Sequence, residues 1–213
     1  MRTLRWVGLV ALIVAAGGLA GCGFMDPPPA ANFSWTPSDP ISRTNVRFTD
    51  DSTDQGGPLG GVGGVKSWDW DFGDSENSST QNPTHAYAKG DTYDVRLTVT
   101  DASGGTSTKE KTITVSPSLN GTWSGYIDNG AARLALTLNL SQTGQGGIGG
   151  SLTIVVQNFT ISSTILAGDQ VTITCLGGLV LDGTLSSNQR SISGWYSING
   201  APQWTWSVNL QGG

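Results

Sequence analysis

The chain has 213 residues, which is enough for one or two domains of about 100 residues each. With 11 basic and 16 acidic residues it carries a formal net charge of −5, which excludes the basic surface that nucleic-acid binding requires. Glycine occurs 31 times, and apolar residues after position 21 are not arranged at helical spacing. The composition therefore predicts an all-β protein.

Residues 1–21 have the three parts of a secretion signal. Arg2 and Arg5 provide a positive start, residues 6–16 form an apolar run, and residues 17–21 are mostly small. The apolar run is marginal in length for a transmembrane helix. We therefore predict a signal peptide, with an uncleaved anchor as the alternative.

The end of this segment, Leu19-Ala20-Gly21-Cys22, resembles the bacterial lipobox, after which signal peptidase II cuts a cysteine-lipidated precursor. The resemblance implies lipidation of Cys22 and hence attachment of the protein to a membrane through lipid. Position 23 is Gly and not the Asp that resembles an inner-membrane retention signal. We expect a lipid-anchored protein of the cell envelope, in the outer membrane if the organism is Gram-negative.

Residues 22–31 are predicted to form a short tether. Three consecutive prolines, at positions 27–29, favour the extended polyproline II conformation. Such a segment would be stiff and would lift the following domain off the bilayer.

Residues 32–116 contain short strand-like runs separated by turns rich in Gly, Asp, Ser and Pro. Several short strands within about 85 residues are typical of a β-sandwich. The runs are residues 31–35, 46–49, 67–72, 93–100 and 108–115.

Three motifs in this segment, in order WDFGD (70–74), NPTHAY (82–87) and GDTYDVRLTVTD (90–101), resemble the polycystic kidney disease (PKD) domain. The resemblance covers essentially the whole segment. It implies an immunoglobulin-like sandwich that serves as an extracellular spacer or as a module binding protein or polysaccharide. Ser75 stands where the family commonly has Gly, and the loop 56–64 is unusually rich in Gly.

The stretch SWDWDFGD, residues 67–74, alternates aromatic and acidic side chains. On a strand the aromatic rings would share one face, towards the core, and Asp69 and Asp71 would share the other. Their separation of roughly 7 Å is compatible with the paired carboxylates of a glycoside hydrolase. Nothing else in the sequence indicates a cleft or an acid of raised pKa, so we predict that the protein is not an enzyme.

Calcium is a second interpretation of these carboxylates, because a hard cation prefers several oxygen ligands. Some bacterial PKD domains bind calcium through such residues, and the matching positions are Asp69 and Asp71, with Asp101 as a third candidate. The alternative is a solvated strand face with Asp74 capping a turn. His85 is the only histidine, which argues against a catalytic triad or a zinc site, and the PKD resemblance implies a packing role for it.

The remainder, residues 119–213, has few charges and a series of short alternating runs. The links between runs suit hairpins, so we predict an eight-stranded antiparallel up-and-down β-barrel or meander. Gly121-Thr122-Trp123 is similar to the first-strand signature of lipocalin-like and avidin-like barrels. The runs are residues 122–127, 133–140, 150–155, 158–166, 170–175, 179–185, 191–198 and 203–210.

Aromatic residues are the candidate ligand-binding groups of this second module. Trp195, Trp204 and Trp206 could stack on a ligand or line a barrel pocket. Trp204 and Trp206 are in phase with the apolar residues that follow, which predicts that both point inward, whereas Trp195 is out of phase with its neighbours and is predicted to face outward. Cys175 alternates with apolar residues and is predicted to be buried and inert.

Taken together, these patterns predict a non-catalytic spacer or binding module that presents the barrel to a glycan or an envelope protein. One alternative is a carrier that holds a small apolar ligand inside the barrel. A weaker alternative is an accessory protein of a polysaccharide-degrading system. The sequence does not indicate an oligomeric state.

Overall fold

The computed structural model describes residues 26–56, 63–128, 130–142, 147–154 and 157–211. The secretion signal and Cys22 lie outside these residues. Every regular element within them is a strand, which confirms the all-β fold class. In these same ranges, no helical segment has the length and apolar character needed to cross a membrane.

The N-terminal half is a sandwich of two antiparallel sheets, with strand orders β1-β2-β5 and β4-β3-β6-β7. The two short strands β4 and β5 were not predicted, because two residues are too few to show an alternating pattern. The strands are β1 Phe33–Thr36, β2 Val46–Asp50, β3 Val65–Asp71, β4 Asn77–Ser78, β5 Thr84–His85, β6 Asp91–Asp101 and β7 Thr106–Val115.

Aromatic rings fill the space between the two sheets. Trp70 is fully buried, its ring lies edge-on to Phe33 at a centroid distance of 5.2 Å, and its indole Nε1 donates to the carbonyl of Thr80. Trp68 is half-buried and donates from Nε1 to Asp50 at 2.7 Å. Since Phe72 is also buried, the aromatic face of residues 67–74 lies towards the core, as predicted.

The last residues of the expected tether lie against the sandwich and do not form a free spacer. The backbone N–H of Ala30 donates to the carbonyl of Thr53, and that of Ala31 donates to Ser107 Oγ. Pro29 is buried. These contacts make residues 26–31 part of the domain, so the spacer between Cys22 and the sandwich is shorter than the proline run indicated.

The C-terminal half is a closed barrel in which every pair of neighbouring strands is antiparallel. Strands adjacent in sequence are neighbours, and the last strand pairs with the first, which confirms an up-and-down barrel. The strands are β8 Gly121–Asp128, β9 Arg133–Gln142, β10 Ile148–Ile154, β11 Gln157–Ala167, β12 Gln170–Cys175, β13 Leu179–Leu185, β14 Ser191–Ile198 and β15 Ala201–Leu210.

The barrel interior is packed with its own side chains. Leu136, Leu138 and Leu140 alternate inward along β9, and Trp123 fills the end nearest the sandwich, donating from Nε1 to the carbonyl of Leu119. A barrel of eight strands is just wide enough for such filling. The other buried members include Ile127, Leu152, Val171, Ile173, Cys175, Leu179, Leu181, Leu185, Ile192, Tyr196, Trp206 and Val208.

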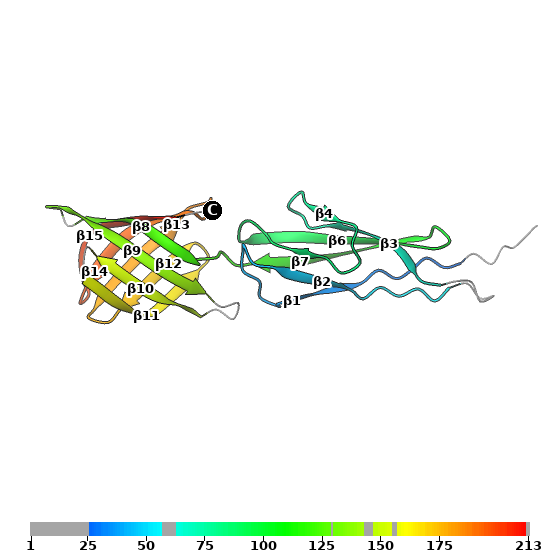
Figure 1. Ribbon diagram of the computed structural model, residues 1–213, viewed down its shortest axis with the longest axis horizontal. Coiled ribbons are helices and arrows are strands. Elements are labelled where there is room, and N and C mark those ends of the chain that lie inside the picture. Colours follow the sequence, from blue (N-terminus) through cyan, green and yellow to red (C-terminus); the bar gives the residue numbers. More distant parts are fainter. Residues whose placement is uncertain (1–25, 57–62, 129, 143–146, 155–156, 212–213) are drawn as a thin grey trace, which may run out of the picture.

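The sandwich and the barrel lie end to end (Figure 1), and the chain passes between them through a short linker after β7. The linker is fastened to the sandwich, because Ser118 N donates to Ser42 Oγ at 3.0 Å and the Arg43 guanidinium donates to the Ser118 carbonyl. From the barrel side, Gln189 reaches across to Gly90 with two hydrogen bonds of 2.8 Å. The barrel is therefore held at the end of the sandwich opposite to residue 26.

Candidate functional site

Three exposed aromatic side chains gather on the barrel wall far from the sandwich. Tyr126 is 54% exposed, Trp195 63% and Trp204 51%. β14 begins beside Gln189 at the sandwich and runs away from it, so Trp195 lies in the far half of the strand. Tyr126 lies on the same side of the barrel, because Ser207 of β15 pairs with Tyr126 on one side and with Ser193, two residues before Trp195, on the other.

Trp195 faces outward as its phase predicted, but the prediction for Trp204 is wrong. Between the pairs Trp195↔Thr205 and Ser197↔Pro202, β14 has one intervening residue and β15 has two. This bulge breaks the inward and outward alternation of β15. Trp204 consequently faces solvent and lies against the turn after β8, where a Cβ at Gly130 would be 3.0 Å from its ring.

Trp206 points inward, as predicted, and supports the wall from behind. Its side chain is 2% exposed, and its Nε1 donates to the carbonyls of Asp182 at 3.0 Å and Trp195 at 3.1 Å. The second bond holds the backbone that carries the Trp195 ring. Trp206 is therefore a positioning residue for the exposed surface.

A hollow of about 410 Å³ lies between the rings of Tyr126 and Trp195. Gly194 is part of its lining, and no side chain would fit there, because a Cβ would lie 1.9 Å from the carbonyl oxygen of Asp182 on β13. Hydroxyl and charged groups surround the base. They come from Asp128, Arg133, Ser193, Thr205 and Ser207.

The charged pair at the edge of this hollow was not identified from the sequence. Arg133 Nε lies 3.4 Å from Asp128 Oδ2, and the Arg133 side chain is 74% exposed. The two residues close the β8–β9 hairpin as directly opposed partners. Their sequence separation of five indicates only a turn, so their place beside Tyr126 and Trp195 depends on the closure of the barrel.

The three carboxylates predicted to hold calcium are not brought together. Asp69 and Asp71 are exposed on β3, and Asp71 Oδ1 accepts a hydrogen bond from the Gly73 N–H. The register pairs Asp69 with Thr98, whereas Asp101 lies at the end of β6 opposite Val65. Among the described residues, no group of three or more Asp, Glu, His or Cys side chains is arranged to hold a metal. The predicted combination is therefore wrong.

Asp101 nevertheless has a surrounding that fits a cation. It is 1% exposed, and its Oδ1 accepts hydrogen bonds from Ser103 N, Ser103 Oγ and Gly105 N, each at 2.8 Å. Its Oδ2 and the Oδ1 of Asp26 are both buried without a hydrogen-bond partner. Ser103 Oγ lies between the two carboxylates, 2.8 Å from Asp101 Oδ1 and 2.9 Å from Asp26 Oδ2, and its single proton can be donated to only one of them at a time. Carboxylate oxygens are ligands that calcium prefers, and these two are buried without a partner on residues that share Ser103.

His85 and Cys175 lie in packed surroundings. The His85 ring stacks on Phe72 at a centroid distance of 4.2 Å, and its Nε2 lies 2.7 Å from Asp74 Oδ2. Asp74 Oδ1 also accepts from the Glu76 N–H, so Asp74 caps the turn as the alternative interpretation predicted. Burial raises the pKa of the Cys175 thiol to about 11, which leaves it protonated and inert at neutral pH.

Comparison with known proteins identifies the sandwich. Residues 27–115 match the family model of the PKD domain. Collagenase ColA of Clostridium perfringens is 49% identical over 53 residues, which are 25% of this chain and 5% of the collagenase. The chain thus corresponds to only a small part of that relative.

Two solved structures are also similar. The PKD1 domain of Vibrio anguillarum Epp shares 32% identity over 44% of this chain and 100% of that domain, with a TM-score of 0.38. A structure described as a carbohydrate-binding module of the β-sandwich superfamily shares 20% identity over 89% of this chain and 94% of its own, with a TM-score of 0.40. The similarity of the barrel to lipocalin-like and avidin-like proteins stays a prediction.

The matched segment begins at residue 27, directly after Asp26, which contacts Ser103 of the sandwich, and ends with the last residue of β7. The three sequence motifs lie within it, on β3, β5 and β6 and the turns that follow or precede them. Residues 27–115 are therefore a PKD domain.

Proposed function

We propose that this protein is a lipid-anchored, non-catalytic binding module of the cell envelope, whose barrel presents an aromatic surface to a glycan. The surface consists of Tyr126, Trp195 and Trp204 with the hollow beside them. The observation that carries the proposal is the exposure of these three rings, each more than half, on the half of the barrel that lies away from the sandwich. Isolated apolar side chains on a surface are common, but two exposed aromatic rings that line one hollow, with a third exposed on the same side of the barrel, are a feature of binding sites.

The chemistry of the hollow suits a sugar. A pyranose has an apolar face of C–H groups that packs on an aromatic ring, and hydroxyl groups at its edges that need hydrogen-bond partners. Trp195 and Tyr126 supply the rings, and Asp128, Arg133 and Ser193 supply donors and acceptors. An apolar partner would leave those polar groups without partners.

The rest of the chain supports presentation at a distance from a membrane. Lipid on Cys22 would anchor the chain, and the PKD domain would hold the barrel away from the bilayer. In a Gram-negative cell we expect the outer membrane. A role as an accessory module of a larger polysaccharide-degrading system is compatible with this arrangement.

Two other functions receive less support. The packed barrel interior argues against a carrier of small apolar ligands. A protein partner is the second candidate, because Leu176 (63% exposed) and Ile198 (44% exposed) extend the apolar character of the far end.

Glycan binding by protein that begins at Gly23, measured on an array of bacterial and plant polysaccharides and then by calorimetry, tests the proposal. Replacing Trp195 with Ala should weaken binding at least about tenfold, since central aromatic contacts are worth about 2 kcal/mol or more and about 1.4 kcal/mol corresponds to a factor of ten. Tyr126→Ala should have a similar effect. Ile165→Ala is the matched control, because Ile165 is 59% exposed on β11 but lies outside the surface.

Failure to bind any glycan, or equal binding by Trp195→Ala, would contradict the glycan proposal. Capture of an envelope protein that is lost in Trp195→Ala and Ile198→Ala would instead favour the protein partner. The anchor is tested separately: Cys22→Ser should release the protein from membranes, and retention of the variant in the membrane fraction would contradict lipidation.

A further inference from the structure

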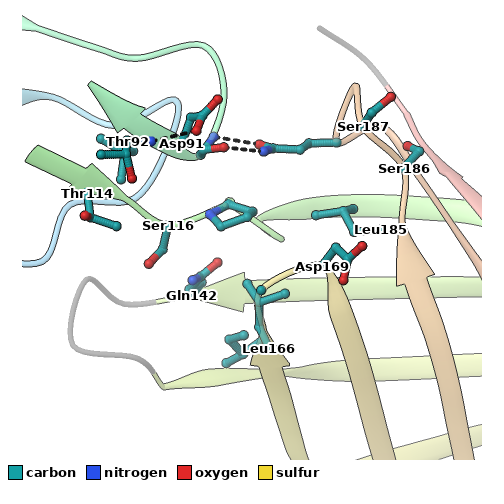
Figure 2. A pocket seen from close by; sticks show the side chains of 16 residues that line it. Asp91, Thr92, Thr114, Ser116, Gln142, Leu166, Asp169, Leu185, Ser186 and Ser187 are labelled. Atoms are coloured by element: carbon teal, nitrogen blue, oxygen red, sulfur yellow. Dashed lines mark hydrogen bonds between the residues drawn. The ribbon is translucent and has the colours of Figure 1, made fainter. Parts of the chain in front are cut away.

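A second hollow, a cleft of about 590 Å³, lies at the opposite end of the barrel, between the barrel and the PKD domain. The start of β6, the end of β7 and the linker form one wall, and the turns β11–β12 and β13–β14 form the other. Figure 2 shows the two walls facing each other across this space. Its volume is within the range of small-molecule sites, which occur preferentially at domain interfaces.

The cleft is preformed because the two domains are joined at its edge. The side-chain amide of Gln189 accepts from the Gly90 N–H and donates to the Gly90 carbonyl, each at 2.8 Å, and both bonds are visible in Figure 2. Gly90 also packs closely on the linker, where a Cβ would lie 2.3 Å from Pro117 N. A paired amide bridge of this kind fixes the orientation of one domain on the other as well as their distance.

The base of the cleft is aliphatic. Leu185 is 3% exposed, Val115 2%, and the half-buried side chains of Leu166 and Ile148 lie beside them. The described lining contains no aromatic ring, which distinguishes this cleft from the hollow beside Trp195. Without a ring for stacking, the cleft lacks the feature that favours a sugar.

One carboxylate stands on each wall. Asp91, on the PKD wall, uses Oδ1 to accept from the Thr92 N–H at 2.8 Å, and Asp169, on the barrel wall, uses Oδ1 to accept from Gln170 Nε2 at 2.9 Å. Among the described residues, no donor reaches the second oxygen of either carboxylate, so each can accept a hydrogen bond from a ligand. The described lining holds neither Lys nor Arg, so its charge is negative.

We propose that this cleft binds a small aliphatic amine whose hydrocarbon chain packs on Leu166 and Leu185 and whose ammonium groups pair with Asp91 and Asp169. An ammonium gives three donors to carboxylate and hydroxyl oxygens, which Thr92, Thr114 and Ser187 also supply. Burial of the chain on the aliphatic base provides the apolar part of the binding free energy. This site is independent of the glycan surface at the other end of the barrel.

Calorimetry of the full-length protein in a neutral detergent, with 1,5-diaminopentane and 1,5-pentanediol as probes, tests this proposal. The diamine should bind and the diol should not, since only the ammonium groups pair with the carboxylates. Asp91→Asn and Asp169→Asn should each weaken diamine binding about tenfold. Asp182→Asn, which removes the same charge from an exposed position on β13, should leave it unchanged.

Equal binding of diamine and diol, or no binding of either, would overturn the proposal. So would an equal loss in Asp182→Asn, because that result would indicate non-specific attraction of cations to an acidic protein. Trp195→Ala should bind the diamine normally, so failure of the glycan proposal and failure of this one are distinguishable. The melting temperature of each variant is measured as well. An unchanged melting temperature shows that weaker binding comes from the missing carboxylate and not from unfolding.

Discussion

In the PKD domain Trp70, Phe72 and Tyr87 are at most 2% exposed, whereas in the barrel Trp195 and Trp204 leave more than half of their surface in solvent. The barrel interior is not too small for indole rings, since the barrel also buries Trp123 and Trp206 completely or nearly so. These aromatic residues of the PKD domain thus belong to its core, while those of the barrel are divided between its core and an exposed surface. The specific contacts of this protein are therefore to be sought on the barrel.

The largest expected effect comes from a pair of tryptophans that are two residues apart on β15. Trp206→Ala should destabilise the barrel by about 3–5 kcal/mol, because it removes a buried indole, and it also removes both hydrogen bonds of that indole. Trp204→Ala should cost about 1 kcal/mol or less, since the ring is exposed. Calorimetry checks both values, with the melting transition of the PKD domain as an internal reference. A large loss in Trp204→Ala would contradict the assignment of that ring to the surface.

Calcium should stabilise the PKD domain and leave the stability of the barrel unchanged. At a concentration of 100 times its Kd, calcium should stabilise that domain by about 2.7 kcal/mol. Asp101→Asn should abolish this stabilisation, because Asp101 supplies one of the two buried unpaired oxygens. Asp71→Asn is the control and should respond to calcium as the wild type does. If calcium leaves the melting temperature of the wild type unchanged, the cation site is refuted.

Which of these features the sequence reveals depends on whether they are local. The strand β9 could be predicted because Leu134 to Leu140 alternate over a whole strand, and the buried Trp70 because it lies within a known motif. Trp204 could not, because a single extra residue in β15 reverses its direction without changing the pattern of the sequence.

Contacts between carboxylates that are far apart in the sequence could not be predicted either. Asp69 and Asp101 occupy the pattern of a metal site, but the register of β3 on β6 keeps them apart. Conversely, Asp26 and Asp101 are joined through Ser103, and Gln189 bridges to Gly90 across 99 positions. Neither contact follows from any local pattern, so the pairing of Asp26 with Asp101 and the cleft between the domains could be found only in the folded chain.

Acid should also destabilise the two domains to different extents. Burial alone would raise the pKa of Asp101, but hydrogen bonds from Ser103, Gly105 and Gly104 outweigh it and hold that pKa below its usual range. Because the pKa is lower in the folded than in the unfolded state, where it is about 3.9, Asp101 stabilises the fold above about pH 4. This stabilisation is lost as the pH falls through the folded pKa.

The melting transition of the PKD domain should consequently fall more steeply below pH 4 than that of the barrel. Among the described residues, the carboxylates with a lowered pKa, Asp50 and Asp101, both belong to the PKD domain. Calorimetry between pH 5 and pH 2.5 measures the two slopes, and Asp101→Asn should flatten that of the PKD domain. Parallel slopes in the wild type would contradict this difference between the domains.

The smallest change in stability is expected at the bridge between the two regions. Gln189→Ala removes two hydrogen bonds that are partly exposed to solvent, each worth about 1 kcal/mol, and it touches neither core. Each domain should keep its own melting temperature within error, while the barrel gains freedom to tilt on the linker. Small-angle scattering should then report a broader distribution of lengths, and the nuclear relaxation times of the two domains should diverge. Gln170→Ala, which removes an exposed amide from the barrel wall, is the control and should change neither the scattering nor the relaxation times. Unchanged scattering in Gln189→Ala would contradict the prediction and would mean that Ser118 and the linker alone fix the two domains end to end.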